Sequence, residues 1–215
     1  LYPSSHHSDR EIEARVRRMT VEERVRVLVA LTGDRDNRRQ RPGRALERPT
    51  YRFDILSDYG AFRDLQRHRL MTIEWQRLTP LHGFSRPPDL DEAGVAGRFD
   101  EAMDRSAALH DVLAEPFPEQ ASYAVSLAYR IRYLMEMNAR EAMHVIELRT
   151  TPQGHPAYRD VCQQMHHLIA DVAGHRAIAE MIRFADHSDE PELERIEAER
   201  RIEERRRARG DATVG

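Results

Sequence analysis

The longest alternating run in the chain constrains the possible fold more than any other stretch. From Ala128 to Met137, apolar side chains recur at every second position, and the positions between them include two arginines and a glutamate. Because successive side chains of a β-strand point to opposite faces, this pattern predicts a strand with one apolar face and one polar, arginine-bearing face. Asn138 follows directly and predicts the start of a helix.

Two shorter segments predict further strands. The segment 51–55 alternates apolar with charged side chains, and the segment 71–75 alternates apolar with polar ones. Between them, the run 60–69 has the apolar spacing of a helix. This predicts that the triplet Arg67-His68-Arg69 forms the end of a helix that lies between two strands.

Helical spacing of apolar residues covers much of the remaining chain. It predicts helices at 9–19, 20–33, 91–114, 138–149, 156–170 and around 178–182. Two of these helices are predicted to begin with a capping box, formed by Thr20 with Glu23 and by Asn138 with Glu141. Beyond Pro191 the chain is a charged run with almost no apolar face, which predicts a solvated charged helix; a partner-binding tail is the alternative.

These patterns divide the chain into three parts. At 215 residues the chain is long enough for one domain with a substantial core, which buries roughly 70% of its unfolded surface. We expect an N-terminal helical segment at 1–33, the domain itself at 34–185 and a charged helical tail at 186–215.

Arginine supplies every basic residue in the chain. There are 34 arginines, no lysine and a formal net charge of -3. The lack of lysine excludes a Schiff-base lysine, a P-loop lysine and a lysine general base, whereas the planar guanidinium of arginine suits phosphate and carboxylate. The small net charge indicates no general affinity for nucleic acid or membranes. A single cysteine and the lack of an apolar run of membrane-spanning length favour a cytoplasmic protein.

Six arginines crowd the stretch 34–48, which has no helical or strand pattern. They are Arg35, Arg38, Arg39, Arg41, Arg44 and Arg48. Two interpretations stay open at this point, a solvated basic loop and a loop that wraps phosphate. A helical module that binds nucleic acid through this stretch is a third hypothesis, which the small net charge and the lack of interleaved aromatic residues oppose.

Metal sites and protein nucleophiles are not predicted. Glu141 and His144 have the Glu-x-x-His spacing of di-iron helices, but that architecture needs a second copy of the motif, and the chain has one. His166 and His167 are adjacent, so on a helix they point about 100° apart and do not share a metal. Cys162 lies on an apolar helical stripe, and neither a Gly-x-Ser-x-Gly elbow nor a Rossmann fingerprint is present.

Four arginines stand where predicted elements begin or end. Arg67 and Arg69 flank His68, while Arg140 lies in the first turn of a predicted helix and Arg149 at the end of the same helix. A helix N-terminus adds free backbone N–H groups to the charge of Arg140. Together these residues predict a site for a phosphate or pyrophosphate.

These residues resemble the signature of the flavin-dependent thymidylate synthases. The resemblance rests on Arg67-His68-Arg69, Asn138-Ala139-Arg140 and Leu148-Arg149, in an order of elements that extends from about residue 43 to residue 170. It implies an α/β (α+β) fold with an antiparallel-rich central sheet flanked by long helices, and a homotetramer with active sites shared between subunits. It also implies bound FAD, dUMP or a related uracil nucleotide as substrate, and methylenetetrahydrofolate and NADPH as co-substrates. The expected reaction is methylation at C5 of the uracil ring.

The resemblance also implies roles for individual residues. The positions that match the family's flavin contacts are Arg44, Arg67, His68, Arg69, Asn138, Arg140 and His144. The positions that match its nucleotide pocket are Asp64, Arg77 and Arg149, and the residues assigned to catalysis are Arg67, His68 and Arg149. Because the hydride chemistry belongs to the flavin, the protein has to orient it and to supply positive charge.

Five positions depart from the family pattern. In the nucleotide pocket, Asp64 replaces a glutamine and Arg77 replaces a serine, and Ser122 stands where an arginine is expected. On the flavin side, Arg44 replaces a small hydroxyl residue and His144 replaces an asparagine. The alternative hypothesis is therefore a catalytically degenerate copy of the fold, which binds flavin or nucleotide as a structural part of a duplicated or hetero-oligomeric assembly.

Overall fold

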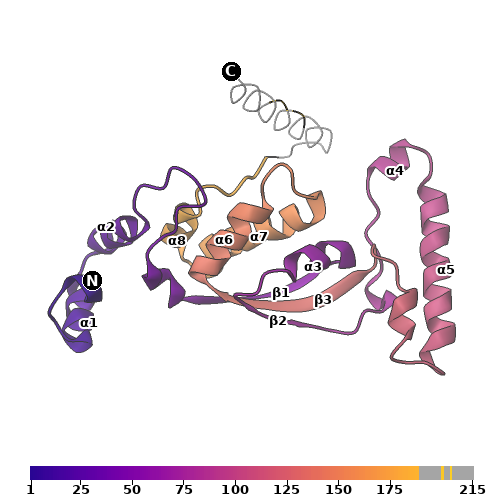
Figure 1. The fold of residues 1–215 in the computed structure, drawn as a ribbon, viewed down its shortest axis with the longest axis horizontal. Helices are drawn as coiled ribbons and strands as arrows, with labels where there is room; N and C mark the ends of the chain where they lie inside the picture. The colour runs from indigo at the N-terminus through magenta and orange to yellow at the C-terminus, as the bar shows by residue number, and fades with distance from the viewer. Residues whose placement is uncertain (189–199, 201–203, 205–215) are drawn as a thin grey trace, which may run out of the picture.

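A small antiparallel sheet forms the centre of the fold. The structure, a computed structural model, describes residues 1–188, 200 and 204. Within them, strands β1 (Thr50–Asp58), β2 (Thr72–Trp75) and β3 (Arg130–Asn138) form a three-stranded sheet in the order β1-β3-β2 (Figure 1). All three predicted strands are confirmed, and the longest alternating run is the central strand, which pairs with both others.

The two faces of the sheet differ as the alternation predicts. On β3, Ile131 and Tyr133 are each 1% exposed and Met135 is fully buried, whereas the intervening positions are only partly covered. In β1, Phe53 lies opposite Met135 on the buried face. On the polar face, Arg132 Nη1 donates to the carboxylate of Asp54 at 3.1 Å.

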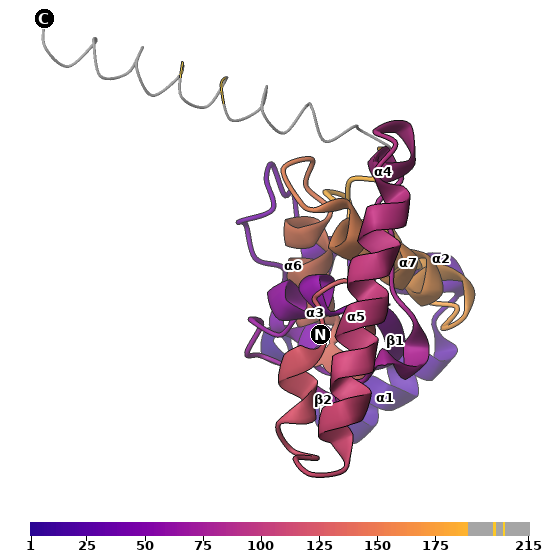
Figure 2. The same ribbon diagram turned by 90° about the vertical axis from the view of Figure 1, so that its right-hand side faces the viewer.

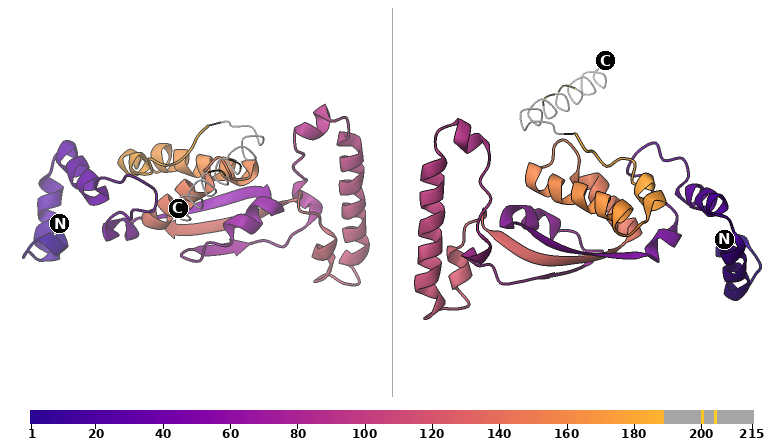
Figure 3. Two further views of the ribbon diagram at one scale, coloured as in Figure 1. Left: turned by 45° about the horizontal axis from the view of Figure 1, so that its top comes forward. Right: turned by 180° about the vertical axis from the view of Figure 1, so that it is seen from behind.

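Helices cover the buried face of the sheet. The helices in the described residues are α1 (Asp9–Arg18), α2 (Val21–Thr32), α3 (Tyr59–Leu65), α4 (Asp89–Glu92), α5 (Ala96–Ala114), α6 (Ala139–Arg149), α7 (Pro156–Asp171) and α8 (Arg176–Met181). Helices α3, α6 and α7 lie over one face of the sheet, with α8 beside α7 (Figures 1 and 3). This confirms a mixed α/β fold with a central antiparallel sheet.

The two ends of the molecule carry helices that lie beside the sheet rather than on it. Helices α1 and α2 lie at one end, and α5 crosses the other end (Figures 1 and 2). The helix predicted at 91–114 is divided, because Gly94 has φ of +67° and separates α4 from α5. Helix α5 packs on a small second core that contains Met103, Val125 and Tyr129.

The triplet Arg67-His68-Arg69 is not helical, and the prediction that it ends a helix is wrong. Helix α3 ends at Leu65, and the triplet belongs to the connection between α3 and β2. The buried face of α3 includes Phe62 and Leu65, and the next position on that face is Arg69. A longer helix would bury that charge at a high cost, so the chain leaves the helix and Arg69 is exposed.

Two further predictions concern the capping box at Thr20 and the charged tail. The Thr20–Glu23 capping box forms, and a second box forms between Ser8 and Glu11 at the start of α1. The charged helical tail predicted at 186–215 lies almost wholly outside the described residues. Among the described helices, none combines the length and the apolar composition that crossing a membrane would require.

Phe62 offers a test of this core. Its side chain is 1% exposed, and its ring lies 4.8 Å from the ring of Tyr133 and 5.6 Å from that of Trp75, measured between centroids. We expect Phe62→Ala to lower the free energy of unfolding by about 3–5 kcal/mol, since it removes contacts and leaves a cavity. Leu81→Ala is the control, because Leu81 is 88% exposed and its loss should change stability by less than about 0.5 kcal/mol. Urea unfolding measures both, and equal effects would contradict the assigned packing.

Candidate functional site

The end of helix α6 brings Arg149 against His68. Arg149 Nε donates a hydrogen bond to His68 Nε2 at 2.9 Å, and Arg149 Nη2 donates to the backbone carbonyl of Asp64 at 2.8 Å. The side chain of Arg149 is 16% exposed, and its guanidinium lies 5.4 Å from the ring centroid of Tyr158. These contacts hold a partly buried guanidinium in one orientation.

The same contacts decide the tautomer of neutral His68. A guanidinium can only donate, so we assign His68 Nε2 as the acceptor and the ring proton to Nδ1. Nδ1 faces the carboxylate of Glu141 at 3.6 Å, and the side chains of His68 and Glu141 are only 6% and 7% exposed. His68 therefore lies between an arginine and a glutamate, with its proton directed at the glutamate.

Glu141 does not close the predicted capping box. Asn138 Oδ1 accepts a hydrogen bond from the backbone N–H of Glu141 at 2.9 Å, as an N-cap does. The carboxylate of Glu141, however, faces His68 instead of the backbone of Asn138. Burial explains the difference from the exposed box at Thr20, because a buried carboxylate requires a charged or polar partner.

Asp64 places negative charge beside two of the predicted arginines. Its carboxylate lies 3.8 Å from Arg149 Nη1 and 3.5 Å from Arg67 Nε. The side chains of Asp64 and Arg67 are 33% and 71% exposed, so solvent screens these ion pairs. Arg69 is exposed and has no ion-pair partner within the part of the chain that the structure describes. The charges of Arg67 and Arg69 therefore face solvent.

A second group of predicted residues gathers at the other end of α6, around Glu47. Arg140 Nη1 donates to Glu47 Oε1 at 2.6 Å, and Arg44 Nη2 donates to Glu47 Oε2 at 3.1 Å. The hydrogen bond from Arg44 is the main reason why the pKa of Glu47 lies below its usual value, and Arg140 lowers the pKa further. The sequence predicted both arginines but not the carboxylate that joins them.

His144 is the predicted site residue on α6 that lies between Arg140 and Arg149 in sequence. The ring of His144 lies 5.7 Å from the ring of His68, between centroids. His144 is exposed overall, yet partial desolvation of its ring lowers its pKa, and the charges of His68 and Arg38 act in the same direction against Glu141. Apart from Arg44, which lies in the 3₁₀ helix before β1, the predicted flavin-side residues lie on or next to α6 and in the loop that precedes β2.

Arg77 lies apart from these groups. It follows β2, and its guanidinium donates to Glu119 Oε1 at 2.6 Å and to the carbonyl oxygen of Pro118 at 3.0 Å. Both partners belong to the segment after α5, at the end of the molecule that α5 crosses. The structure therefore brings Arg149, Asp64 and His68 together, and it separates Arg77 from them within one chain.

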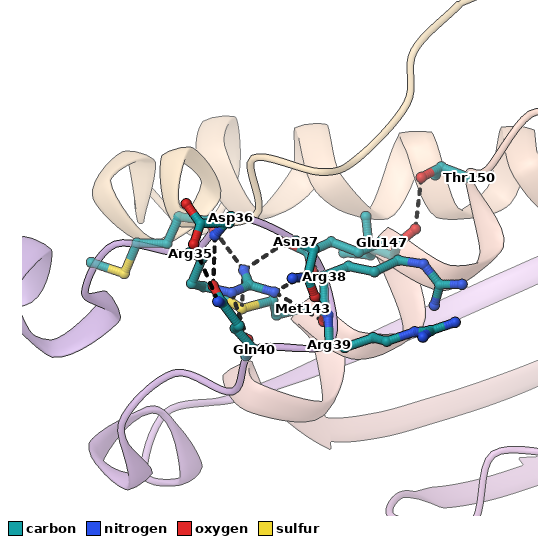
Figure 4. A network of polar contacts seen from close by, with 11 residues as sticks. Arg35, Asp36, Asn37, Arg38, Arg39, Gln40, Met143, Glu147 and Thr150 are labelled. Atoms are coloured by element: carbon teal, nitrogen blue, oxygen red, sulfur yellow. Dashed lines mark hydrogen bonds and ion pairs between the residues drawn. The ribbon is translucent and has the colours of Figure 1, made fainter.

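A buried ion pair lies beneath this surface, between Arg35 and Glu147 on α6. The side chains are 2% and 1% exposed, and two hydrogen bonds of 2.8 and 2.6 Å join the guanidinium to the two carboxylate oxygens (Figure 4). The interpretation of the stretch 34–48 as a solvated loop is therefore wrong for Arg35. Sequence reasoning missed this pair because its members are 112 residues apart, and residue spacing does not show which distant segments meet.

Four partners of the predicted residues were missed, namely Glu47, Glu119, Glu141 and Tyr158. Glu141 was interpreted as a capping residue and weighed as part of a Glu-x-x-His motif, but not as a partner of His68. Glu47 belongs to the short 3₁₀ helix at Arg44–Glu47, which has no strong sequence signal. A signal existed for Glu141, because a glutamate on the same helical stripe as apolar residues needs a buried partner.

The remaining reactive groups offer no alternative centre in the described residues. Burial raises the pKa of the Cys162 thiol to about 12, which keeps it protonated. No group of three or more His, Cys, Asp or Glu side chains there is arranged to hold a metal ion. A groove of about 590 Å³ lies between β1 and α7, and it is lined by none of the predicted site residues.

The chain matches known proteins along most of its length. Residues 3–174 match the family described as thymidylate synthase complementing protein. Proteins named UPF0159 are similar in sequence, with 37% identity over 201 residues in Chlamydia muridarum and 36% identity over 201 residues in Thermoplasma acidophilum. These matches cover 94% and 93% of this chain but only 37% and 40% of the relatives, so the chain spans about two fifths of their length.

One solved structure has a similar fold. The UMP/dUMP methylase PolB from Streptomyces cacaoi, determined with 5-Br dUMP bound, superposes with a TM-score of 0.59 at 18% sequence identity. The match covers 78% of this chain and 84% of that structure. At this identity the similarity establishes the fold alone.

The lowered pKa of His144 predicts a pH dependence of stability. The folded-state pKa lies below the ordinary value of about 6.5, so the unfolded chain binds a proton on acidification before the folded chain does. The free energy of unfolding should therefore fall as pH drops below about 6.5. His144→Asn should reduce this loss between pH 7 and pH 5 in urea unfolding. An identical loss in the variant would contradict the prediction.

Proposed function

The chain belongs to the thymidylate synthase complementing protein family, and we propose that it methylates C5 of dUMP or a related uracil nucleotide. The methylene group would come from methylenetetrahydrofolate, and NADPH would supply the hydride through FAD. The observation that carries this proposal is the contact of Arg149 with His68 and Asp64. It joins a residue of the predicted nucleotide pocket to the predicted flavin-contacting triplet.

The residues around α6 suit a phosphate-bearing cofactor. The candidate flavin site contains Arg67, Arg69 and Arg140, of which the first two present their guanidiniums to solvent. Guanidinium groups bind phosphate oxygens with paired hydrogen bonds. These residues therefore fit FAD, and Asn138, which caps α6, would orient the helix end toward it.

Bound FAD would supply the hydride-transfer chemistry, so the protein has to hold and orient the reactants. His68 is fixed by Arg149 and Glu141, and it would keep the edge of the flavin site rigid. Asp64 and Arg149 would hold the nucleotide beside it. In this arrangement no side chain of the chain has to act as a covalent nucleophile.

Arg149 retains the capacity to bind an anion. Two of its hydrogen bonds are to neutral acceptors, the ring of His68 and the backbone of Asp64. Among the residues that the structure describes, the one carboxylate paired with its charge is that of Asp64, at 3.8 Å. A nucleotide phosphate would therefore meet an incompletely paired guanidinium in a partly buried position, where the interaction is stronger than on an open surface.

We also propose a homotetramer with shared sites. Several large apolar residues on and after α5 are exposed, namely Leu109 (51%), Val112 (71%), Phe117 (54%) and Tyr123 (89%). Apolar surface of this kind marks interfaces between chains. A second subunit would also allow Arg77 to act at a site other than the one of its own chain. Light scattering would give the number of subunits.

A second candidate function is a structural copy without activity. It is favoured because Arg140 and Arg77 already form ion pairs, with the carboxylates of Glu47 and Glu119 respectively. In addition, the relatives are long enough to hold another unit of this size. In that case the chain would keep the fold and hold flavin or nucleotide for a partner unit.

Tritium release from C5-labelled dUMP, in the presence of FAD, NADPH and methylenetetrahydrofolate, tests the proposed reaction. We expect release by the wild-type protein and a loss of about tenfold or more in Arg149→Ala, since a charged hydrogen bond contributes roughly 1.5–3 kcal/mol. Arg98→Ala on α5 is the control for removal of an exposed arginine and should retain activity. No release by the wild type would favour the structural copy.

Flavin retention tests the cofactor assignment. The purified protein should be yellow with a flavin absorption spectrum, and Arg67→Ala or Arg140→Ala should lower the bound flavin fraction, because each removes a cation from the proposed site. Arg98→Ala should retain flavin. A colourless protein that does not bind added FAD would rule out the flavin site, whatever the result of the tritium assay.

A further inference from the structure

The guanidinium of Arg35 fixes the loop from Arg35 to Gln40 through hydrogen bonds to the loop's backbone carbonyl oxygens. Arg35 Nε donates to the carbonyl oxygen of Gln40 at 2.8 Å, and Arg35 Nη2 donates to the carbonyl oxygen of Arg38 at 3.3 Å. A third bond goes from Nη1 to the carbonyl oxygen of Met181, at the end of α8. Because the same guanidinium is bound to Glu147, the loop backbone is tied to the core on α6.

Bonds within the loop complete its shape. The backbone N–H of Asp36 donates to Gln40 Oε1 at 2.6 Å, and Gln40 Nε2 donates to Asp36 Oδ2 at 3.3 Å. The backbone N–H of Arg39 donates to Asn37 Oδ1 at 3.0 Å. Asp36, Asn37 and Gln40 thus form hydrogen bonds within the loop. The side chains of Arg38 and Arg39 do not take part in them.

Arg38 and Arg39 are the unpaired cations of this loop. Both are exposed, and neither has an ion-pair partner in the described part of the chain. Their side chains extend from the loop in the same direction (Figure 4). Neighbouring guanidiniums repel each other, and a loop backbone fixed at this position keeps them together.

The carboxylates of α6 near Arg38 are already paired. Arg38 is close enough to His144 for its charge to act on that ring, and His144 adjoins His68, which is bound to Arg149. The two carboxylates of this part of α6 are already engaged, Glu141 with His68 and Glu147 with Arg35. An anion here would meet Arg38 and Arg39 without a competing carboxylate on α6.

We propose that Arg38 and Arg39 bind a phosphate group of a nucleotide ligand, and that Arg35 is the residue that positions them. The two guanidiniums would donate to the phosphate oxygens in paired hydrogen bonds. The inference rests on the proposed function for the identity of the ligand, but not for the existence of the anion site. The phosphate could come from the dinucleotide cofactor or from the uracil nucleotide, because both carry the same group.

Calorimetric titration of the flavin-free protein with inorganic pyrophosphate tests the site without any enzymatic activity. We expect Arg38→Gln/Arg39→Gln to weaken binding by about tenfold or more, since the variant loses charge-assisted hydrogen bonds to the phosphate oxygens. Arg98→Gln/Arg105→Gln on α5 removes the same charge from exposed positions and should leave the affinity unchanged. No binding by the wild type, or equal weakening in both double variants, would overturn the proposal.

Two further titrations distinguish the source of the phosphate. FAD is compared with riboflavin, and dUMP with deoxyuridine, in the wild type and in Arg38→Gln/Arg39→Gln. If the variant binds FAD more weakly but riboflavin as well as the wild type does, the phosphate belongs to FAD. The same comparison of dUMP with deoxyuridine would assign it to the uracil nucleotide. If pyrophosphate binding falls but neither nucleotide is affected, the site binds an adventitious ion only and the nucleotide assignment is wrong. These titrations measure binding and not activity, so their results can be interpreted even if the tritium assay shows no release.

The positioning role of Arg35 needs a variant that removes both members of the buried pair. A single substitution would leave an unpaired buried charge, which destabilises strongly, whereas Arg35→Met/Glu147→Leu replaces both with apolar groups of similar size. We expect this variant to stay folded in urea unfolding and to bind pyrophosphate about tenfold more weakly, although Arg38 and Arg39 remain. Wild-type affinity in the folded variant would overturn the role of Arg35.

Discussion

The buried ion pair between Arg35 and Glu147 is the interaction that holds the loop 35–40 against α6 and α8. Glu147 is 1% exposed on a helix whose inward positions are otherwise largely apolar, and an isolated carboxylate there would be costly. Arg35 compensates it from 112 residues earlier in the chain. Because its other N–H groups bind the carbonyl oxygens of Arg38, Gln40 and Met181, one guanidinium joins a loop, α6 and α8.

Helix α6 organises the candidate site in the same way. Its apolar residues pack on the sheet, and its charged residues contact segments that are distant in sequence. Arg140 meets Glu47 before β1, Glu141 meets His68 after α3, and the guanidinium at the end of the helix meets His68 from the other side. A single buried helix therefore aligns groups that are distant in sequence, which is how a fold with a small sheet can present an extended cationic surface.

The parts of the fold that could be predicted are those that depend on local spacing. The alternation at 128–137 is produced by burial of one face of a strand, so the central strand was visible without knowledge of its partners. The end of α3 was not visible, because it depends on whether Arg69 would be buried and on the contact of His68 with Arg149, 81 residues away. The same reason explains why the carboxylates around the predicted arginines were missed.

The sequence alone determined most of the helices and strands, and it predicted the type of chemistry. Alternating and helical spacing predicted the sheet and most helices, and a chain whose cations are all arginine predicted anion binding by fixed guanidiniums. Only the tertiary structure decided which arginines are available. Arg35 forms a buried ion pair with Glu147, and Arg77 is paired with Glu119. Arg38 and Arg39, by contrast, face solvent. The physical reason is that pairing and burial depend on contacts between distant segments, which residue spacing does not encode.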